Sequence, residues 1–306
     1  TFTNAHSPSA VCTPTRYGLL TGRYAWRTQP DRGVLGGYAP PLIEPGRATL
    51  ATLFKQRGYH TACIGKWHLG LNYSRPNPAQ PAWWGNQLDP DSVNVDFSRP
   101  VTGLREAGFD ESFALPISLD APPYCFIRNG VVLGQPLRFQ LGNPVLTDGH
   151  STGRFFRKGM MASGFTPEKT LPALVSEAEA YLERNARKPF FLYLALSSPH
   201  APWAPDAPFA GKSPIGPYGD LVAQTDAAVG RVLATLSRLN LTENTLVIFT
   251  SDNGAFWFEE DIRRTGHRAN GDERGLKADS YEGGSHVPLL VQWKGRVKAN
   301  VRSAQL

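Results

Sequence analysis

Helix-like segments alternate with short apolar runs along this chain, and this alternation constrains its fold more than any other feature. Residues 48–58 have helical spacing and stop at Gly58, and the amphipathic patterns over 170–187 and 218–240 predict two longer helices. The run 188–198 is typical of a strand buried on both faces. This order predicts an α/β sandwich with a mainly parallel central sheet flanked by helices. The expected strands are 59–65, 188–198, 244–254 and 287–295.

Between the first and second strands, residues 72–167 are rich in Pro, Gly and Asn and carry no long periodic segment. We expect an elaborate loop region there, with a small hairpin in 126–139 (FIRNGVVLGQPLRF). No apolar stretch approaches roughly 18 residues, so no membrane span is predicted. The net charge is +6, but the basic residues are scattered. This distribution disfavours nucleic acid as a partner and is compatible with a small anionic substrate.

The chain has three cysteines, which is too few for a disulfide framework. Cys63 lies in an expected strand and is interpreted as a small buried apolar residue, whereas the sequence suggests no role for Cys125. Cys12 stands beside Pro14 and before Arg16, at the expected start of a helix. A thiol at a helix N-terminus near a cation is acidified. Cys12 is therefore a candidate nucleophile or modification site, and a plain loop cysteine is the alternative.

Polar motifs follow three of the expected strands: GKWHLG (65–70), SPHAPW (198–203) and SDNG (251–254). In open α/β sheets, ligands bind at the carboxyl ends of the strands. We therefore expect all three motifs on one edge of one sheet.

Each motif offers a particular chemistry. Asp252 and Asn253 supply a carboxylate and an amide oxygen, which suit Ca²⁺ or Mg²⁺, although a turn uses the same residues. Lys66 and His68 are two residues apart, so an extended backbone would point both to the same side. His200 lies between two prolines, in a stiff loop that suits a general acid. For each motif, an ordinary loop role is the alternative.

Taken together and in order, these motifs resemble the type I sulfatases of the alkaline phosphatase superfamily. The resemblance runs from Cys12 to about residue 293 and includes the Cys-x-Pro-x-Arg signature. It implies an alkaline phosphatase-like fold with a single sulfatase catalytic domain over 1–306. The motifs that carry it are CTPTRYGLLTGR (12–23), GYHTACIGKWHLG (58–70), SPHAPW, FTSDNG (249–254) and GLKADSYEGGSHVPLL (275–290).

The resemblance also implies a mechanism. A separate maturation enzyme would oxidise Cys12 to formylglycine, whose hydrate attacks the sulfur of a sulfate ester with help from Arg16 and a calcium ion, or magnesium in its place. Lys66 and Lys277 would bind the sulfate oxygens. The remaining roles follow the same resemblance: His200 protonates the leaving oxygen, His68 deprotonates the second hydroxyl, and Asp252 and Asn253 bind the metal.

Other implications concern the ends and the pocket. Family members carry an Asp-Asp at the end of a first strand and a smaller C-terminal subdomain. Neither is found in the 306 residues, so we expect a fragment with little activity by itself. His267 and Asn270 are candidate substrate contacts. His286 stands where many members have Arg, and a packing role is expected. A sulfated carbohydrate substrate and a periplasmic, secreted or lysosome-like compartment are suggested by resemblance.

Three alternatives remain open at this stage. The chain could belong to a phosphonate or phosphate ester hydrolase of the same superfamily. It could also be a non-catalytic carbohydrate-binding protein, or an inactive fragment that keeps the motifs. A hydrolase with a thiol nucleophile, using His68 or His200 as its base, is the third possibility.

Overall fold

The structure is a computed structural model that describes residues 1–28, 33–83, 90–142, 153 and 156–305. It divides into two compact units, one of residues 1–34 and 230–306 and one of residues 35–229. Helix α4 (Pro217–Arg238) passes from the second range into the first. Among the described residues, no helix is long and apolar enough to cross a membrane.

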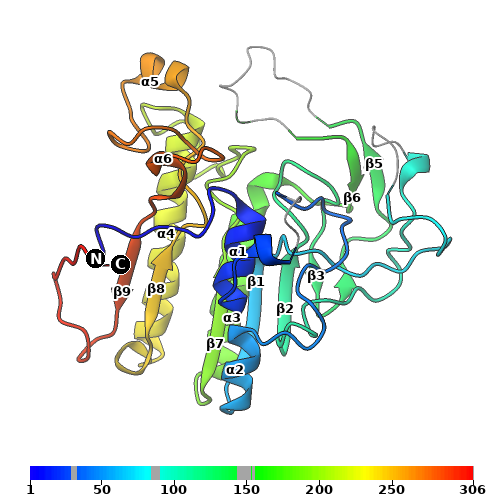
Figure 1. Cartoon of the computed structure of the whole chain (residues 1–306), viewed down its shortest axis with the longest axis horizontal. Helices are drawn as coiled ribbons and strands as arrows, with labels where there is room; N and C mark the ends of the chain where they lie inside the picture. The colour runs from blue at the N-terminus through cyan, green and yellow to red at the C-terminus, as the bar shows by residue number, and fades with distance from the viewer. Residues whose placement is uncertain (29–32, 84–89, 143–152, 154–155, 306) are drawn as a thin grey trace. The chain divides into compact units, whose positions relative to one another are not determined.

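The unit of residues 35–229 is built on a five-stranded sheet with the strand order β4-β3-β2-β1-β7 (Figure 1). Strand β1 pairs in parallel with β2 on one side and β7 on the other, whereas β3 and β4 are antiparallel. This mainly parallel centre confirms the predicted α/β class. The strands are β1 (His60–Lys66), β2 (Glu111–Leu115), β3 (Ile127–Arg128), β4 (Val131–Val132) and β7 (Phe190–Ala195).

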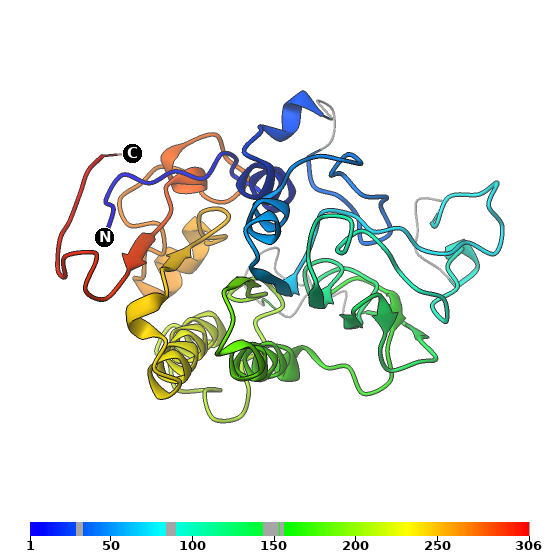
Figure 2. The ribbon, with the colours of Figure 1, turned by 90° about the horizontal axis from the view of Figure 1, so that it is seen from below.

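Helices α2 (Leu50–Gln56) and α3 (Pro167–Asn185) cover opposite faces of this sheet (Figure 2). Successive residues of β7 point to opposite faces, as strand geometry requires. Phe191 accordingly stacks on Phe54 of α2 with ring centroids 4.6 Å apart, while Phe190 meets Tyr181 of α3 edge-on. Both helices had been predicted from their spacing, as had α4.

A capping box sets the start of α2. The Thr49 hydroxyl accepts a hydrogen bond from the Thr52 amide, and the Thr52 hydroxyl accepts one from the Thr49 amide. These two bonds satisfy backbone donors that have no partner within the helix. The Thr49 hydroxyl also donates to the Ala107 carbonyl, which fixes α2 on the segment leading into β2.

Strand β2 corrects one sequence prediction, because it lies inside the segment 72–167 that was expected to be loop-rich. Its five residues are too few to show a period, yet four of them are buried beside β1. The hairpin expected in 126–139 is confirmed by β3 and β4. They are joined by Asn129 and Gly130, both with positive φ (49° and 84°), as a tight hairpin turn needs.

In the other unit, β8 (Val247–Thr250) and β9 (Leu289–Gln292) pair with each other in antiparallel fashion. The expectation that these strands join β1 and β7 in a single sheet is therefore wrong. The expectation that the strand in 188–198 is buried on both faces is also wrong. Strand β7 is the edge of its sheet and is mostly half-buried, and three of the four β8 residues are exposed.

The remaining described elements are short, apart from α1. A small antiparallel pair, β5 with β6, belongs to the unit of residues 35–229, and α1, α5 and α6 belong to the other. Their bounds are α1 (Cys12–Thr21), β5 (Arg138–Gln140), β6 (Gly159–Met161), α5 (Glu259–Thr265) and α6 (Glu282–Ser285), with 3₁₀ turns at Ala25–Arg27, Pro90–Ser92 and Thr242–Asn244.

Candidate active site

Cys12 is the first residue of α1. Val11 before it is extended (φ −141°) and offers no side-chain cap, and the helix ends ten residues later at Gly22, which adopts the left-handed conformation. The Cys12 side chain is buried, with only 2% of the residue exposed. Its Sγ lies 3.6 Å from Oδ1 of Asn253, to which the thiol donates. The sequence-predicted helix start is confirmed, but the thiol is not accessible on the surface.

Arg16 lies one turn further along α1 and therefore on the same side of the helix as Cys12. Its Nε and Nη2 both donate to Oδ2 of Asp252, at 2.8 and 2.7 Å. The two side chains are 8% and 22% exposed, so water weakens this ion pair only in part. The pair joins the signature helix to the turn after β8.

The turn of residues 251–254 orients the predicted metal ligands. The Ser251 hydroxyl donates to the Asn253 carbonyl at 2.8 Å, and the Asn253 Nδ2 donates to the Gly254 carbonyl at 2.9 Å. These bonds leave Oδ1 of Asn253 directed at Cys12. The donors fit Ca²⁺ chemically, because a carboxylate and an amide oxygen stand side by side, although they supply only two of the six to eight oxygens that calcium takes.

Backbone hydrogen bonds join the loop that carries Lys277 to the segment after the 251–254 turn and to the segment before Cys12. The Lys277 amide donates to the Ala255 carbonyl at 3.1 Å, and the Ala278 amide donates to Ala10, two residues before the signature cysteine. At Gly254 a Cβ atom would lie 1.9 Å from the carbonyl oxygen of Gly283, so only glycine permits this close approach. The structure thus brings Cys12 and the Lys277 segment together within one unit.

The two candidate substrate contacts differ in their surroundings. His267 is exposed, and its ring lies edge-on to Trp257. The Asn270 side chain braces the loop: Oδ1 accepts from the Ala255 amide at 2.8 Å, and Nδ2 donates to the Ala255 carbonyl at 3.1 Å. A role in substrate binding stays a prediction for both, and for Asn270 it would add to this structural role.

In the unit of residues 35–229, Lys66 ends strand β1 and is 2% exposed. The extended backbone stops there, because His68 has a φ of 57°, in the left-handed region. The expectation of one extended segment carrying both side chains is therefore wrong. His68 is also 2% exposed, and its Nε2 donates to the Leu35 carbonyl at 2.9 Å. With Nε2 protonated, Nδ1 is the ring nitrogen that can accept a proton.

His200 lies near an acid that sequence reasoning missed. Its Nδ1 is 2.7 Å from the Ala201 carbonyl and 3.9 Å from Oδ1 of Asp120. Arg157 donates to the other oxygen, Oδ2, of Asp120 at 2.5 Å. Burial alone would raise the pKa of Asp120, but the charges of His200, Arg157 and Lys66 outweigh it and hold this pKa below its ordinary value. The sequence feature that could have indicated this role is that Asp120 is a single acidic residue directly after the apolar segment 113–119.

Strand pairing explains why Lys66, Asp120 and His200 belong together. In the parallel ladders, Lys66 pairs with Leu115 of β2, and Gly65 pairs with Ala195 of β7. The segments that follow these three strands therefore leave the same edge of the sheet. The predicted edge is confirmed for GKWHLG and SPHAPW, whereas SDNG follows a strand of the separate β8–β9 pair.

Comparison with known proteins identifies the class to which these features belong. A family model described as Sulfatase matches residues 1–306, so the chain belongs to the Sulfatase family. It is 33% identical to an N-acetylgalactosamine-6-O-sulfatase of Bacteroides thetaiotaomicron, over 99% of this chain and 62% of that protein. It is 34% identical to the steryl-sulfatase of Rattus norvegicus, over 93% of this chain and 54% of that protein.

A solved structure gives the same result. A protein described in the metabolism of multiple glycosaminoglycans by Bacteroides thetaiotaomicron matches with a TM-score of 0.82 and 31% identity. The match covers 97% of this chain and 65% of that one. The chain thus spans between about half and two thirds of the length of these three relatives.

Proposed function

We propose that the protein is a sulfuric ester hydrolase that cleaves an O-sulfate ester on a carbohydrate. The observation that supports this most directly is the environment of Cys12, in a chain of the Sulfatase family. Cys12 begins a helix, its Sγ is held by Asn253, and Arg16 one turn later is paired with Asp252. A cysteine that served only for packing would need neither the contact with Asn253 nor the Arg16–Asp252 ion pair one helical turn away.

In this proposal a maturation enzyme, which supplies a two-electron oxidant and removes the sulfur as sulfide, converts Cys12 to formylglycine before catalysis. When hydrated, the aldehyde would supply one hydroxyl to attack sulfur as the ester S–O bond breaks, and a second whose deprotonation would release sulfate and restore the aldehyde. Asn253 holds the group through Oδ1, and Arg16 places a fixed positive charge one helical turn away. An ordinary serine or thiol would instead remain sulfated, because it has no second hydroxyl with which to expel the product.

Charge neutralisation is the main task of the surrounding residues, because a sulfate ester is anionic and repels a nucleophile. Lys66 and Lys277 bind the sulfate oxygens in the proposed reaction. Asp252 and Asn253 would hold a Ca²⁺ ion, or Mg²⁺ in its place, which would supply further positive charge at the nucleophile. Preorganised charges of this kind contribute several kcal/mol to transition-state stabilisation.

Two histidines move protons in the proposed reaction. His200 donates to the leaving alcohol oxygen, and the Asp120 carboxylate faces its Nδ1 from 3.9 Å away. His68 accepts a proton from the second hydroxyl at Nδ1, because its Nε2–H is engaged by the Leu35 carbonyl. In this proposal Asp120 acts through its contact with His200, as a positioning residue, and the sequence did not predict this role.

The proposal is tested by mass spectrometry of the Cys12 peptide, combined with turnover assays. The intact protein is co-expressed with a sulfatase-maturing enzyme and assayed on an aryl sulfate. We expect the peptide to show conversion of the thiol to an aldehyde, and activity to follow the converted fraction. Unmodified Cys12 in an active preparation would refute the formylglycine mechanism and favour a thiol nucleophile.

The same assay separates the remaining alternatives. We expect an aryl sulfate to be cleaved faster than an aryl phosphate or phosphonate by the converted enzyme. The reverse order would indicate a phosphonate or phosphate ester hydrolase. Converted protein that turns over none of the three, yet binds a sulfated sugar, would indicate a carbohydrate-binding protein.

The nature of the substrate is tested by a direct comparison, because the relatives include both a carbohydrate sulfatase and a steryl-sulfatase at similar identity. N-acetylgalactosamine 6-sulfate and a steryl sulfate are assayed with the same preparation. A higher kcat/KM for the sugar is expected. A preference for the sterol would leave the sulfatase proposal intact and overturn the carbohydrate assignment.

A further inference from the structure

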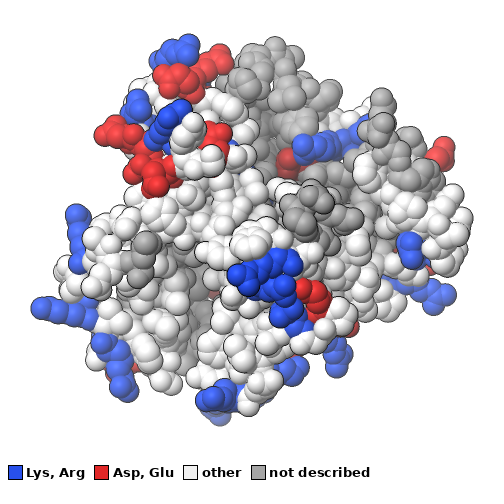
Figure 3. Space-filling view, in the orientation of Figure 1, with Lys and Arg blue, Asp and Glu red and all other residues white. Residues whose placement is uncertain are grey.

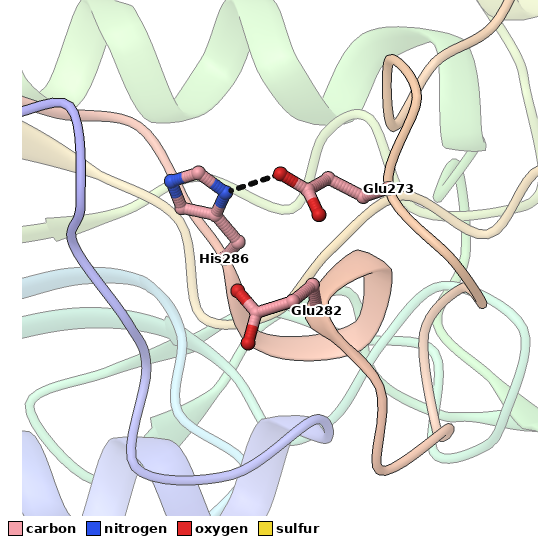
Figure 4. A group of neighbouring side chains, drawn as sticks. All are labelled: Glu273, Glu282 and His286. Atoms are coloured by element: carbon pink, nitrogen blue, oxygen red, sulfur yellow. Dashed lines mark hydrogen bonds and ion pairs between the residues drawn. The ribbon is translucent and has the colours of Figure 1, made fainter.

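Four side chains of types that bind metal ions gather in the unit of residues 1–34 and 230–306, and the proposed reaction assigns a role to none of them. This His–Glu cluster consists of His6, Glu273, Glu282 and His286, and Figure 4 shows the last three. Glu282 begins helix α6, and His286 immediately follows its end. From the sequence, only a packing role was expected for His286.

Three members of the cluster, Glu273, Glu282 and His286, are close enough to share one ion, and His6 holds one of them. His6 Nε2 lies 2.7 Å from Oε2 of Glu282, and His286 Nδ1 lies 3.1 Å from Oε1 of Glu273. The two imidazole rings stack with centroids 5.1 Å apart. The ligand atoms of Glu273, Glu282 and His286 all lie within 4.8 Å of one another. A tetrahedral ion with bonds of about 2.1 Å needs about 3.4 Å between ligand atoms, so these three side chains would close in by about 1 Å and a water molecule would be the fourth ligand.

The second nitrogen of His286 is already bound as in known metal sites. Its Nε2 donates to the Thr3 carbonyl at 3.1 Å, and its Nδ1 points at Oε1 of Glu273, where a metal ion would take the place of the hydrogen-bonding proton. Metal-binding histidines almost always donate their other ring N–H to a carbonyl or carboxylate, which fixes the tautomer and the ring orientation. This contact is independent of the clustering itself and fixes the direction in which Nδ1 points.

The donor types select the metal. One imidazole nitrogen and two carboxylate oxygens are ligands that zinc accepts, whereas calcium prefers oxygen alone. The side chains are between 28% and 57% exposed, so an ion can enter from solvent. Figure 3 shows Asp and Glu side chains, interspersed with Lys and Arg, over the part of the surface formed by α5 and α6.

The position of the cluster suggests what an ion would do. His6 precedes Cys12 by six residues, and Glu282 follows Lys277 by five. The two segments already meet through backbone contacts, including the Ser7 amide to the Ser285 carbonyl at 2.8 Å. We propose that the His–Glu cluster is a structural zinc site that fastens the segment carrying Cys12 to the segment carrying Lys277. This inference stands whether or not the protein is a sulfatase.

Zinc binding tests the proposal without any activity assay. The protein used is the Cys12→Ser variant, because the substitution removes a thiol that would compete for Zn²⁺. Bound metal is first removed with a chelator, and excess Ca²⁺ is then added to occupy sites that offer only oxygen ligands. Zn²⁺ is titrated by calorimetry, and Co²⁺ is used as a visible probe of tetrahedral nitrogen and oxygen ligands. We expect one Zn²⁺ per chain, a rise in the thermal midpoint and a Co²⁺ spectrum that Zn²⁺ abolishes.

Variants identify the ligands. His286→Gln and His6→Gln are each expected to weaken Zn²⁺ binding by at least about tenfold, because the first removes a ligand and the second removes the hydrogen bond that orients the ligand Glu282. His60→Gln is the matched control, since His60 also lies near a glutamate (3.7 Å from Glu111) but is not part of this cluster. Its affinity should equal that of the parent chain.

Two outcomes would overturn the site: the parent chain binds no Zn²⁺, or both cluster variants bind it as tightly as the His60 variant. The thermal midpoints of the zinc-free forms show whether each variant still folds. If His286→Gln does not fold, His6→Gln alone decides, because His6 contributes its ring only at the edge of the cluster.

Discussion

At the scale of single residues, the partners of Cys12 matter more than its place in the sequence. The pattern Cys-x-Pro-x-Arg predicts a reactive or modified cysteine, and this prediction needs only spacing. Sequence could not show that the side chain is 2% exposed with its sulfur held by Asn253, because Asn253 is 241 residues away. Such contacts depend on the fold, and so do the burial of His68 and the role of Asp120.

The burial of Cys12 leads to a prediction about the order of events. A maturation enzyme must reach the thiol, so we expect conversion only before the chain has folded. A synthetic peptide of residues 1–25 should be converted by the purified maturation enzyme, whereas the folded chain, purified with an intact thiol, should not. Mass spectrometry of the Cys12 peptide measures both. Equal conversion of peptide and folded chain would show that α1 opens readily.

The metal site is tested at Asp252. Ligand binding to the native state stabilises it by about 2.7 kcal/mol at a ligand concentration of 100 Kd. We expect Ca²⁺ to raise the thermal midpoint of the parent chain, a chelator to reverse the rise, and Asp252→Asn to remove most of it. The rise in midpoint that Ca²⁺ causes is compared between the parent chain and the variant. The midpoints themselves are not compared, because Asp252→Asn also loses the ion pair with Arg16. Asp120→Asn is the control and should keep the full shift.

At the scale of elements, periodicity predicts what is long and local. The spacing of apolar residues correctly predicted α2, α3 and α4, and the Asn129–Gly130 dipeptide marked the hairpin turn. Strand β2 was missed because five residues carry no measurable period. The separation of β8 and β9 from the five-stranded sheet was missed as well, since strand pairing is a long-range property that apolar runs do not encode.

One ion pair connects the hairpin to a helix and gives a testable contribution to stability. Arg128 of β3 donates two hydrogen bonds to Glu177 of α3, at 2.8 and 2.6 Å. The Arg128 side chain is 42% exposed, so we expect a coupling free energy of only about 1 kcal/mol. A double-mutant cycle with Arg128→Met and Glu177→Gln, measured by urea unfolding, gives this value. Additive effects of the two substitutions would show that the pair contributes nothing.

The pH dependence of this coupling has a definite sign. The hydrogen bond with Arg128 holds the pKa of Glu177 below its ordinary value of 4.5. A carboxylate whose pKa is lowered in the folded state stabilises that state above the unfolded value and loses the contribution as pH falls through the folded value. We therefore expect the full coupling at neutral pH and a decline at pH values below 4.5. A coupling that grows in acid would contradict the assignment.

At the scale of the whole molecule, net charge is the property that bears on function. The 306 residues carry a formal charge of +6, with Lys and Arg scattered along the chain. A positive protein attracts an anionic substrate over distances of about a Debye length, which is about 10 Å at 0.1 M salt. A polyanionic sulfated oligosaccharide feels this attraction more than a small ester with one charge.

Added salt should therefore lower kcat/KM more for the larger substrate. We expect kcat/KM of the active enzyme on a sulfated oligosaccharide to fall severalfold between low and physiological ionic strength, and kcat/KM on an aryl sulfate to change little. The effect should lie in KM rather than kcat, because screening acts on encounter and not on the bound ester. Replacing NaCl with potassium acetate at equal ionic strength controls for specific ion effects. Equal salt dependence for the two substrates would show that the scattered positive charge serves solubility alone.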